Sequence, residues 1–213
     1  MLQQRFRNRE DAGRQLAARL DAYQNRPDVV VLGLPRGGVP VAYEVAHHLA
    51  APLDVFVVRK LGLPGQSELA MGAIAGGSVE VLNHDVIDHL GVPRAVVDRV
   101  VERERAELQR REMAFREGRV ALDLAGKTVV VVDDGLATGS TMEAAIAALR
   151  QIGPARIVVA VPVGAAETCA RLQTTADEVV CLATPWPFSA VGQWYEDFAQ
   201  TTDQEVRALL SAR

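Results

Sequence analysis

The stretch Thr128-Val-Val-Val-Val-Asp-Asp-Gly-Leu-Ala-Thr-Gly-Ser-Thr141 decides the fold that we expect for this chain. Its four consecutive valines are β-branched and apolar on both sides, which predicts a strand buried on both faces of a parallel sheet. Two carboxylates, Asp133 and Asp134, follow at the carboxyl end of that strand. Open α/β sheets bind their ligands at that end, so the acidic pair is a candidate binding site.

Small and hydroxyl residues follow the acidic pair. Gly135 and Gly139 allow a flexible turn, and hydroxyls and backbone N–H groups come next at Thr138, Ser140 and Thr141. At the start of the helix that we expect there, such groups form a phosphate-binding cradle. Because carboxylates beside a phosphate would repel it, the acidic pair is expected to face sugar hydroxyls or hydrated Mg²⁺. A ribose 5-phosphate would satisfy both halves; the alternative is a buried strand followed by an ordinary N-capped helix.

This stretch closely resembles the 5-phosphoribosyl-1-pyrophosphate (PRPP) motif of type I phosphoribosyltransferases, in which four apolar residues precede an acidic pair, three small or apolar residues and Thr-Gly-x-Thr. The resemblance implies that Asp133 and Asp134 hold the ribose 2′- and 3′-hydroxyls, and Mg²⁺ through those hydroxyls or water. It also implies that the following loop holds PRPP and its 5′-phosphate, through Gly135, Leu136, Ala137, Thr138, Gly139, Ser140 and Thr141.

A second anion site is expected after the first apolar strand, residues 28–34. That strand ends in a glycine-rich turn and a helix, where Arg36 could add its charge to the N–H groups of Gly37 and Gly38. The family has a similar loop, which contacts pyrophosphate and often contains a strained peptide bond. A tight connection between strand and helix is the alternative.

Two cations, Arg59 and Lys60, close the next predicted strand, residues 53–58. At the carboxyl end of a parallel strand they would face the same edge as the acidic pair. The resemblance implies that both contact the pyrophosphate leaving group and take part in catalysis. The alternative is a solvated strand end.

The segment from residue 61 to 82 is expected to hold a polar, glycine-rich loop over 61–70 and a hairpin over 71–82 with Gly76 and Gly77 at its turn. In the family a mobile loop at this position closes over PRPP and excludes water. Here the segment carries no Lys, Arg or His, which disfavours a mechanism resembling that of orotate phosphoribosyltransferase.

The remaining pattern alternates strands, over 156–161 and at an edge over 177–182, with helices, including an amphipathic one over 11–23. We therefore predict one α/β domain over residues 1–213: a doubly wound, mostly parallel sheet flanked by helices, like that of type I phosphoribosyltransferases. A charged helical insertion is expected over about 85–118, and a small hood or tail over about 183–213. The residues around 6–13 are expected to form a solvated helix cap, with a hood over the site as the alternative.

The insertion and the tail could each contribute to function. Glu and Arg nearly cancel along the insertion, which argues against a nucleic-acid partner and favours a helix bordering the site or a homodimer contact. Aromatic residues gather in the tail, and we expect its candidates for stacking on an acceptor base to be Trp186, Phe188 and Trp194. The alternative is that these rings, with Tyr195 and Phe198, seal the core or a subunit interface.

Composition sets limits on the setting of the chain. Its 23 Lys and Arg against 27 Asp and Glu give a net charge of −4, which implies no general attraction to nucleic acid or acidic membranes. Two cysteines without metal-ligand spacing are typical of a reduced compartment. We find no segment near the roughly 20 apolar residues that cross a bilayer, so a cytoplasmic protein without a membrane partner is expected.

The first functional hypothesis is Mg²⁺-dependent transfer of phosphoribose from PRPP to a nitrogenous base or similar nucleophile. Ala137 stands where 6-oxopurine enzymes carry an acidic residue, which argues against hypoxanthine or guanine as the acceptor. The second hypothesis is a PRPP-sensing regulatory module with little or no turnover. A ribose-phosphate phosphatase or phosphorylase is a third.

Overall fold

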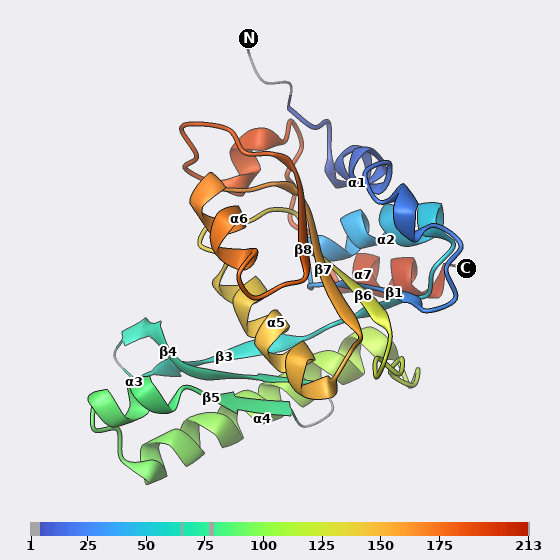
Figure 1. Ribbon diagram of the computed structural model, residues 1–213. Coiled ribbons are helices and arrows are strands. Elements are labelled where there is room, and N and C mark those ends of the chain that lie inside the picture. The colour runs from blue at the N-terminus through green and yellow to red at the C-terminus, as the bar shows by residue number, and fades with distance from the viewer. Residues whose placement is uncertain (1–4, 65, 77–78, 213) are drawn as a thin grey trace.

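Five parallel strands form the central sheet of the molecule, with the valine strand in the middle (Figure 1). The computed structural model describes residues 5–64, 66–76 and 79–212, without the side chains of residues 66–69. The strands lie in the order β2 (Leu53–Val55), β1 (Val29–Gly33), β6 (Thr128–Val132), β7 (Arg156–Val163) and β8 (Glu178–Ala183). Each of the four neighbouring pairs is parallel and β8 lies at an edge, which confirms the predicted fold class.

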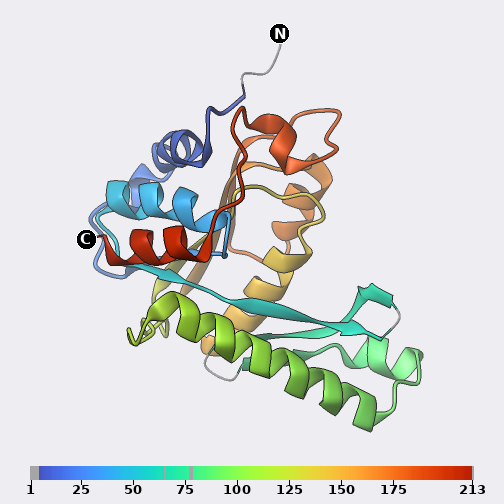
Figure 2. The ribbon, with the colours of Figure 1, turned by 180° about the vertical axis from the view of Figure 1, so that it is seen from behind.

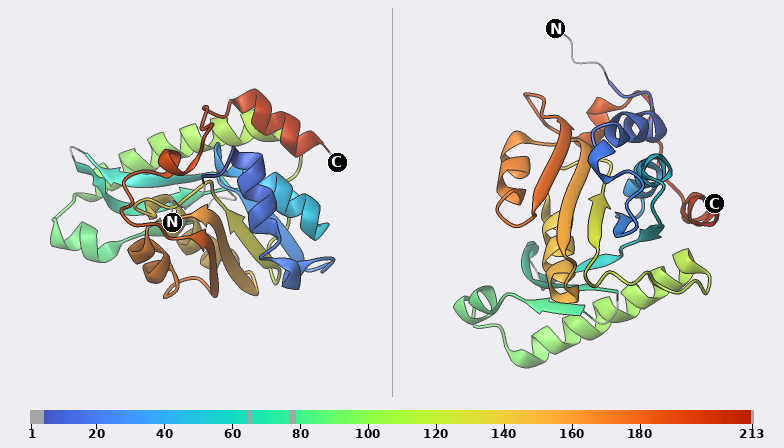
Figure 3. Two further views of the ribbon diagram at one scale, coloured as in Figure 1. Left: turned by 90° about the horizontal axis from the view of Figure 1, so that it is seen from above. Right: turned by 45° about the vertical axis from the view of Figure 1, so that its right-hand side comes forward.

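Helices cover both faces of this sheet because alternate residues of its strands point to opposite faces. On one face α1 (Arg9–Ala17) and α2 (Gly38–Leu49) pack against Val31, Val130 and Val158. On the other, α5 (Ser140–Ile152) and α6 (Ala166–Leu172) pack against Val30, Val131 and Val159. The two helix layers are seen edge-on in Figure 3. Burial on both faces is the reason that β1 and β6 are continuous runs of apolar residues.

Residues 53–82 fold differently from the prediction, because most of them form a second, antiparallel sheet. The expected strand over 53–58 is wrong: β2 ends at Val55, and the chain enters β3 (Val58–Leu63), which pairs with β4 (Gln66–Ala75). The expected loop over 61–70 is therefore largely strand. The predicted hairpin is confirmed in β4 and β5 (Val79–Leu82), although Gly77 in its turn lies outside the described residues.

Helices α3 (His84–His89) and α4 (Arg94–Arg116) occupy the range of the expected insertion. The apolar side of α4 packs against the second sheet and against α7 (Asp203–Ser211), through Val97, Val101 and Leu108 (Figure 2). Short 3₁₀ helices occur over Asp21–Tyr23 and Val191–Trp194. Among the described residues no helix has both the length and the apolar character needed to cross a membrane.

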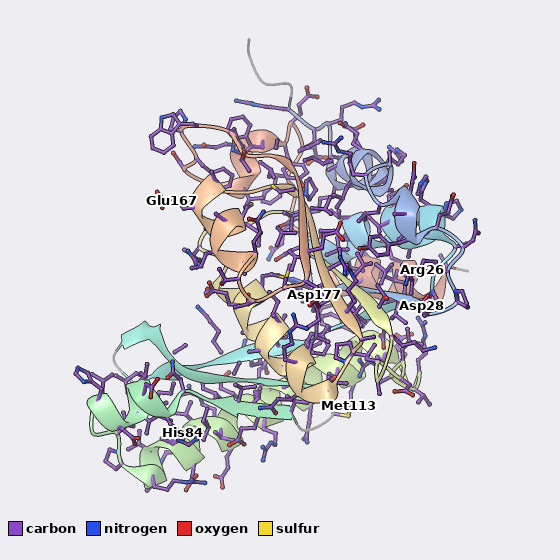
Figure 4. All side chains as sticks on the ribbon, in the orientation of Figure 1. Arg26, Asp28, His84, Met113, Glu167 and Asp177 are labelled. Carbon is purple, nitrogen blue, oxygen red and sulfur yellow. The ribbon has the colours of Figure 1, made fainter. Side chains whose placement is uncertain are left out.

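The amino ends of β1 and β6 are tied together at the far end of the sheet. Asp28 accepts hydrogen bonds from Arg26, at 2.7 Å, and from the Thr128 hydroxyl, at 3.0 Å. The hydrogen bonds from Arg26 lower the pKa of Asp28 to about 2. In Figure 4 the labelled Arg26 and Asp28 lie away from the labelled Glu167, which is on helix α6. The residues at this end anchor the strands, and the opposite, carboxyl end is left for a ligand.

The order of the strands reverses between β1 and β6. From β1 the chain moves outward to β2, and after the insertion it returns to the other side of β1 and continues through β7 to β8. Open α/β sheets bind their ligands in the crevice at such a switch point, outside the carboxyl ends of the strands. The loops after β1 and β6 therefore meet at the expected position of a site.

Candidate functional site

The loops after β1 and β6 touch without room for a side chain between them. The Leu34 N–H donates to the carbonyl of Val132 at 2.9 Å. A Cβ atom on Gly38 would lie 2.6 Å from the Val132 carbonyl oxygen and 2.8 Å from the Asp133 Cα. A Cβ on Gly37 would overlap the Asp134 carboxylate. Gly38 is required because backbone must approach backbone, and Gly37 because the Asp134 carboxylate occupies the space of a side chain. The peptide bond that joins Pro35 to Arg36 is cis.

The two carboxylates of the pair face different surroundings. Asp133 lines a pocket of about 170 Å³, together with the loop from Gly135 to Met142 and Val191. Asp134 turns toward α1, where its Oδ2 accepts a hydrogen bond of 2.8 Å from the Arg9 Nε. The structure thus brings the first acid and the predicted cradle into one pocket and holds the second acid beside it.

Burial changes the acidity of both groups. It raises the pKa of Asp133 well above its usual range, and the neighbouring charge of Asp134 raises it further. Burial also raises the pKa of Asp134, while the charge and hydrogen bond of Arg9 act in the opposite direction. Two carboxyl groups with raised pKa values are typical of a functional site, where bound hydroxyl donors or a cation would stabilise their charged forms.

The cradle is built at the start of α5. Gly139 adopts φ 76°, a left-handed conformation that favours glycine, and Ser140 begins the helix. The Thr138 hydroxyl lies 3.3 Å from that of Ser140. Lys60 reaches the same hydroxyl from β3, with its Nζ 3.1 Å from the Ser140 Oγ. A helix N-terminus, two hydroxyls and an ammonium group together suit a phosphate.

Helix α6 holds the cradle from behind. The Thr168 hydroxyl donates to the carbonyl of Ala137 at 2.7 Å, and the Arg171 Nη2 donates to the carbonyl of Thr138 at 2.6 Å. Arg171 also pairs with Glu143 at 2.6 Å, which neutralises the one acid in the first turn of α5. Because both carbonyls are engaged by α6, neither presents its negative end to an anion, and the N–H groups of the loop are left for it.

The three predicted basic residues lie in three different places. Arg59 and Lys60 are neighbours in β3, so their side chains point to opposite faces of the strand. Lys60 faces the cradle, whereas the Arg59 Nε donates to Glu104 of α4 at 2.8 Å. The expectation that both cations close a strand of the central sheet is therefore wrong. Arg36 extends toward α7, where its Nη1 lies 3.5 Å from the Asp203 Oδ1.

The aromatic tail packs beside the acidic pair. Tyr195 is 3% exposed, and its hydroxyl donates to the Asp134 carbonyl at 2.6 Å. Phe188 and Trp194 stack with ring centroids 6.5 Å apart in a small cluster with Phe6. Trp186 is 91% exposed. The tail thus seals a minor core, as one alternative held, and leaves one large ring in solvent.

The N-terminal segment caps α1 as expected, since the Asn8 side chain accepts a hydrogen bond of 2.9 Å from the Asp11 N–H, but the segment is not wholly solvated. Phe6 is 7% exposed and pairs with Tyr195 through backbone and ring. Helix α1 begins at Arg9 and ends at Ala17, short of the predicted end at residue 23. Arg9 lies between Asp134 and the Phe198 ring. Sequence patterns do not reveal this role, because the polar start of a helix looks the same with or without a distant partner.

A parallel sheet with an acidic residue and a helix N-terminal cradle at its switch point defines a protein of the type I phosphoribosyltransferase class. The chain belongs to the phosphoribosyl transferase domain family, whose family model matches residues 4–72 and 64–196.

Named relatives agree with this membership. A Mycobacterium tuberculosis protein provisionally named a phosphoribosyl transferase is 55% identical over 205 residues, which cover 96% of this chain and 46% of that protein. The chain thus spans about half the length of this curated relative. The bifunctional protein PyrR of a Roseiflexus species is 36% identical over 124 residues, covering 57% of this chain and 62% of that protein.

Solved structures share the fold. The crystal structure of the protein TT1426 from Thermus thermophilus has a TM-score of 0.88 and 45% identity, and the match covers 97% of each chain. A hypoxanthine-guanine phosphoribosyltransferase from Bacillus anthracis, 13% identical with a TM-score of 0.50, covers 84% of this chain and 80% of its own and is similar in fold alone.

The contact between Thr168 and the cradle can be tested directly. We expect Thr168→Val to weaken PRPP binding by about 2–10-fold, because one neutral hydrogen bond contributes about 0.5–1.5 kcal/mol. Isothermal titration calorimetry measures the effect. Thr168→Ser keeps the hydroxyl and should bind PRPP almost as the wild type does. Wild-type affinity in Thr168→Val together with a loss in Thr168→Ser would show that the Thr168 methyl group, not its hydrogen bond, supports the loop.

Proposed function

We propose that this chain binds PRPP and transfers its 5-phosphoribosyl group to a nitrogenous base or related nucleophile. In this reaction the bond between the ribose C1 and the pyrophosphate oxygen breaks, and a bond forms between C1 and the nucleophile. The electron pair of the broken bond leaves with pyrophosphate, and the nucleophile loses its proton to solvent or buffer.

One observation carries the proposal: Asp133 and the cradle line the same pocket. A cradle of N–H groups suits the 5′-phosphate, and a carboxylate suits the hydroxyls of the sugar attached to it. Asp133 is the one acidic or basic side chain among the residues that line this pocket. The chemistry is therefore expected to depend on positioning and on stabilisation of charge more than on proton transfer by the protein.

Mg²⁺ fits this donor set as an ion shared with the ligand. Carboxylate oxygens are its preferred protein ligands, and it usually keeps several waters or substrate oxygens. Asp133 and Asp134 would hold it through ribose hydroxyls or water; the described residues include no cluster of three or more His, Cys, Asp or Glu that could hold a metal alone. When bound, Mg²⁺ neutralises charge on the pyrophosphate. From the protein, Lys60 beside the cradle is the best-placed cation for the same task.

The tail is a candidate wall for the acceptor. Trp186 presents an exposed ring. Phe188 and Trp194, which follow Trp186 in the sequence, stack on each other. A flat aromatic surface of this kind can stack on a base.

Two free thiols, Cys169 and Cys181, support a reducing, cytoplasmic setting.

The test is a panel of purine and pyrimidine bases and simple amines incubated with the protein, PRPP and Mg²⁺. We expect pyrophosphate release that depends on one member of the panel and on the protein. Release without any acceptor would instead indicate hydrolysis.

A regulatory function is the second candidate. The segment from residue 61 to 82 lacks Lys, Arg and His, and relatives named as the bifunctional protein PyrR share part of this chain. A sensor would bind PRPP tightly in calorimetry and release no pyrophosphate with any acceptor. Absence of PRPP binding would contradict both functions.

A further inference from the structure

Arg9 makes contacts on three sides, from residues far apart in the sequence. Its Nε donates to the Asp134 Oδ2 at 2.8 Å, and its Nη1 donates to the carbonyl of Ala199 at 2.7 Å. Its guanidinium carbon lies 3.9 Å from the centroid of the Phe198 ring. The Arg9 side chain is 12% exposed. A guanidinium fixed by a carboxylate, a carbonyl and an aromatic face has little freedom to move.

The backbone around Arg9 is fixed to the same tail. The Phe6 N–H donates to the Trp194 carbonyl at 2.9 Å, and the N–H of Glu196 donates back to Phe6 at 2.8 Å. The Asp197 N–H donates to the Arg7 carbonyl at 2.9 Å. The N-terminal segment and the tail therefore form one unit, which we call the terminal clamp (residues 6–9 and 194–199).

This clamp holds both the backbone and the side chain of Asp134. Tyr195 donates to the Asp134 carbonyl, and Arg9 donates to one oxygen of its carboxylate. Among the described residues, Arg9 is the one whose side chain donates a hydrogen bond to the Asp134 carboxylate, and it does so at Oδ2. Gly37 allows the carboxylate to lie against the loop after β1, since a side chain there would overlap it.

We infer that Arg9 is a positioning residue for the ribose end of the site: it fixes Asp134 by one oxygen and leaves the other for a ribose hydroxyl. This inference rests on the proposed function. The terminal clamp thus orients the Asp134 carboxylate from outside the pocket. A carboxylate that is already oriented loses less freedom when the sugar binds.

The experiment compares two ligands in the full chain without metal, by calorimetry. Ribose 5-phosphate uses the acidic pair and the cradle, whereas inorganic phosphate uses the cradle alone. We expect Arg9→Gln to weaken ribose 5-phosphate binding by up to about 10-fold, because the sugar must then order the Asp134 side chain itself. Phosphate binding should be unchanged. Arg9→Lys keeps the charge but not the fork of donors, so it should restore part of the affinity.

Two further variants separate positioning from folding. Arg14→Gln lies on the same helix, where Arg14 is 53% exposed and 3.6 Å from Glu44, and it should bind both ligands as the wild type does. Phe198→Leu removes the ring under Arg9 and should weaken ribose 5-phosphate selectively, even if Arg9→Gln fails to fold.

The outcomes are distinct. Wild-type ribose 5-phosphate affinity in Arg9→Gln, or an equal loss for both ligands, would overturn the inference while leaving the proposed function in place. If ribose 5-phosphate binding is unaffected by Asp133→Asn and Asp134→Asn, the proposed function itself fails, and the inference fails with it.

Discussion

Replacing both acids, as Asp133→Asn with Asp134→Asn, is expected to abolish PRPP binding in isothermal titration calorimetry. A carboxylate accepts hydroxyl protons with a full charge, whereas an amide is neutral and offers one acceptor oxygen. Each hydrogen bond to a charged group contributes about 1.5–3 kcal/mol. Loss of both therefore weakens binding by about 10²–10⁴-fold.

Protein stability provides the control for this experiment. Burial raises the pKa of Asp133, so the folded state binds a proton more readily than the unfolded state does. As the pH rises from the ordinary carboxyl value through the raised one, ionisation of Asp133 makes the free protein less stable. The single variant Asp133→Asn removes that cost. Its Tm should exceed that of the wild type at neutral pH, and the difference should shrink as the pH falls toward about 4.

The pair of measurements separates function from folding. If Asp133→Asn is more stable than the wild type yet binds PRPP weakly, it has lost a binding group and not its structure. If the doubly substituted protein binds PRPP with wild-type affinity, the acidic pair does not hold the ribose.

Gly38→Ala is expected to have the second large effect, on stability and on binding together. The added Cβ would lie 2.6 Å from the carbonyl oxygen of Val132 and 2.8 Å from the Asp133 Cα, and both are backbone atoms that cannot turn aside. Overpacking of this kind costs about 1–3 kcal/mol. At about 2–4 °C for each kcal/mol in a domain of this size, the Tm should fall by about 2–12 °C. PRPP affinity should fall because the acidic pair is displaced.

Gly153→Ala is the matched control. Gly153 adopts φ 81° at the end of α5, and a Cβ there meets nothing within 4 Å. The strained backbone should lower the Tm by about 2–4 °C, for a cost of about 1 kcal/mol, and leave PRPP affinity unchanged. Thermal unfolding and calorimetry check both variants. A Gly38→Ala protein with native Tm and affinity would show that the two loops do not touch.

The central sheet could be predicted because a strand that is buried on both faces is a continuous run of apolar residues in the sequence. The valine runs of β1 and β6 and the apolar run of β7 are continuous, and each precedes a helix. The boundary after Val55 could not be predicted. Residues 53–58 are one mostly apolar run, but they are divided between two sheets: Val55 pairs with Gly33 of β1, and Val58 pairs with Ala75 of β4. Hydrophobic pattern shows that a strand is buried, not which sheet it joins.

The site divides in the same way. Asp133 and the cradle are adjacent in sequence, so one motif predicts both. Arg9, Tyr195 and Thr168 reach the motif from 125, 61 and 31 residues away, and no local pattern marks them. Their contacts depend on how the termini and α6 fold over the loop. Arg59 lies apart from the cradle for a different reason, because strand alternation turns its side chain to the face opposite Lys60.

The most direct measurement is a crystal structure of the chain with ribose 5-phosphate bound. We predict that the 5′-phosphate lies on the backbone N–H groups of residues 138–141, with the ribose hydroxyls within hydrogen-bond distance of Asp133. A phosphate bound elsewhere, or a sugar directed away from the acidic pair, would contradict the claim that these two groups hold the two ends of one ligand.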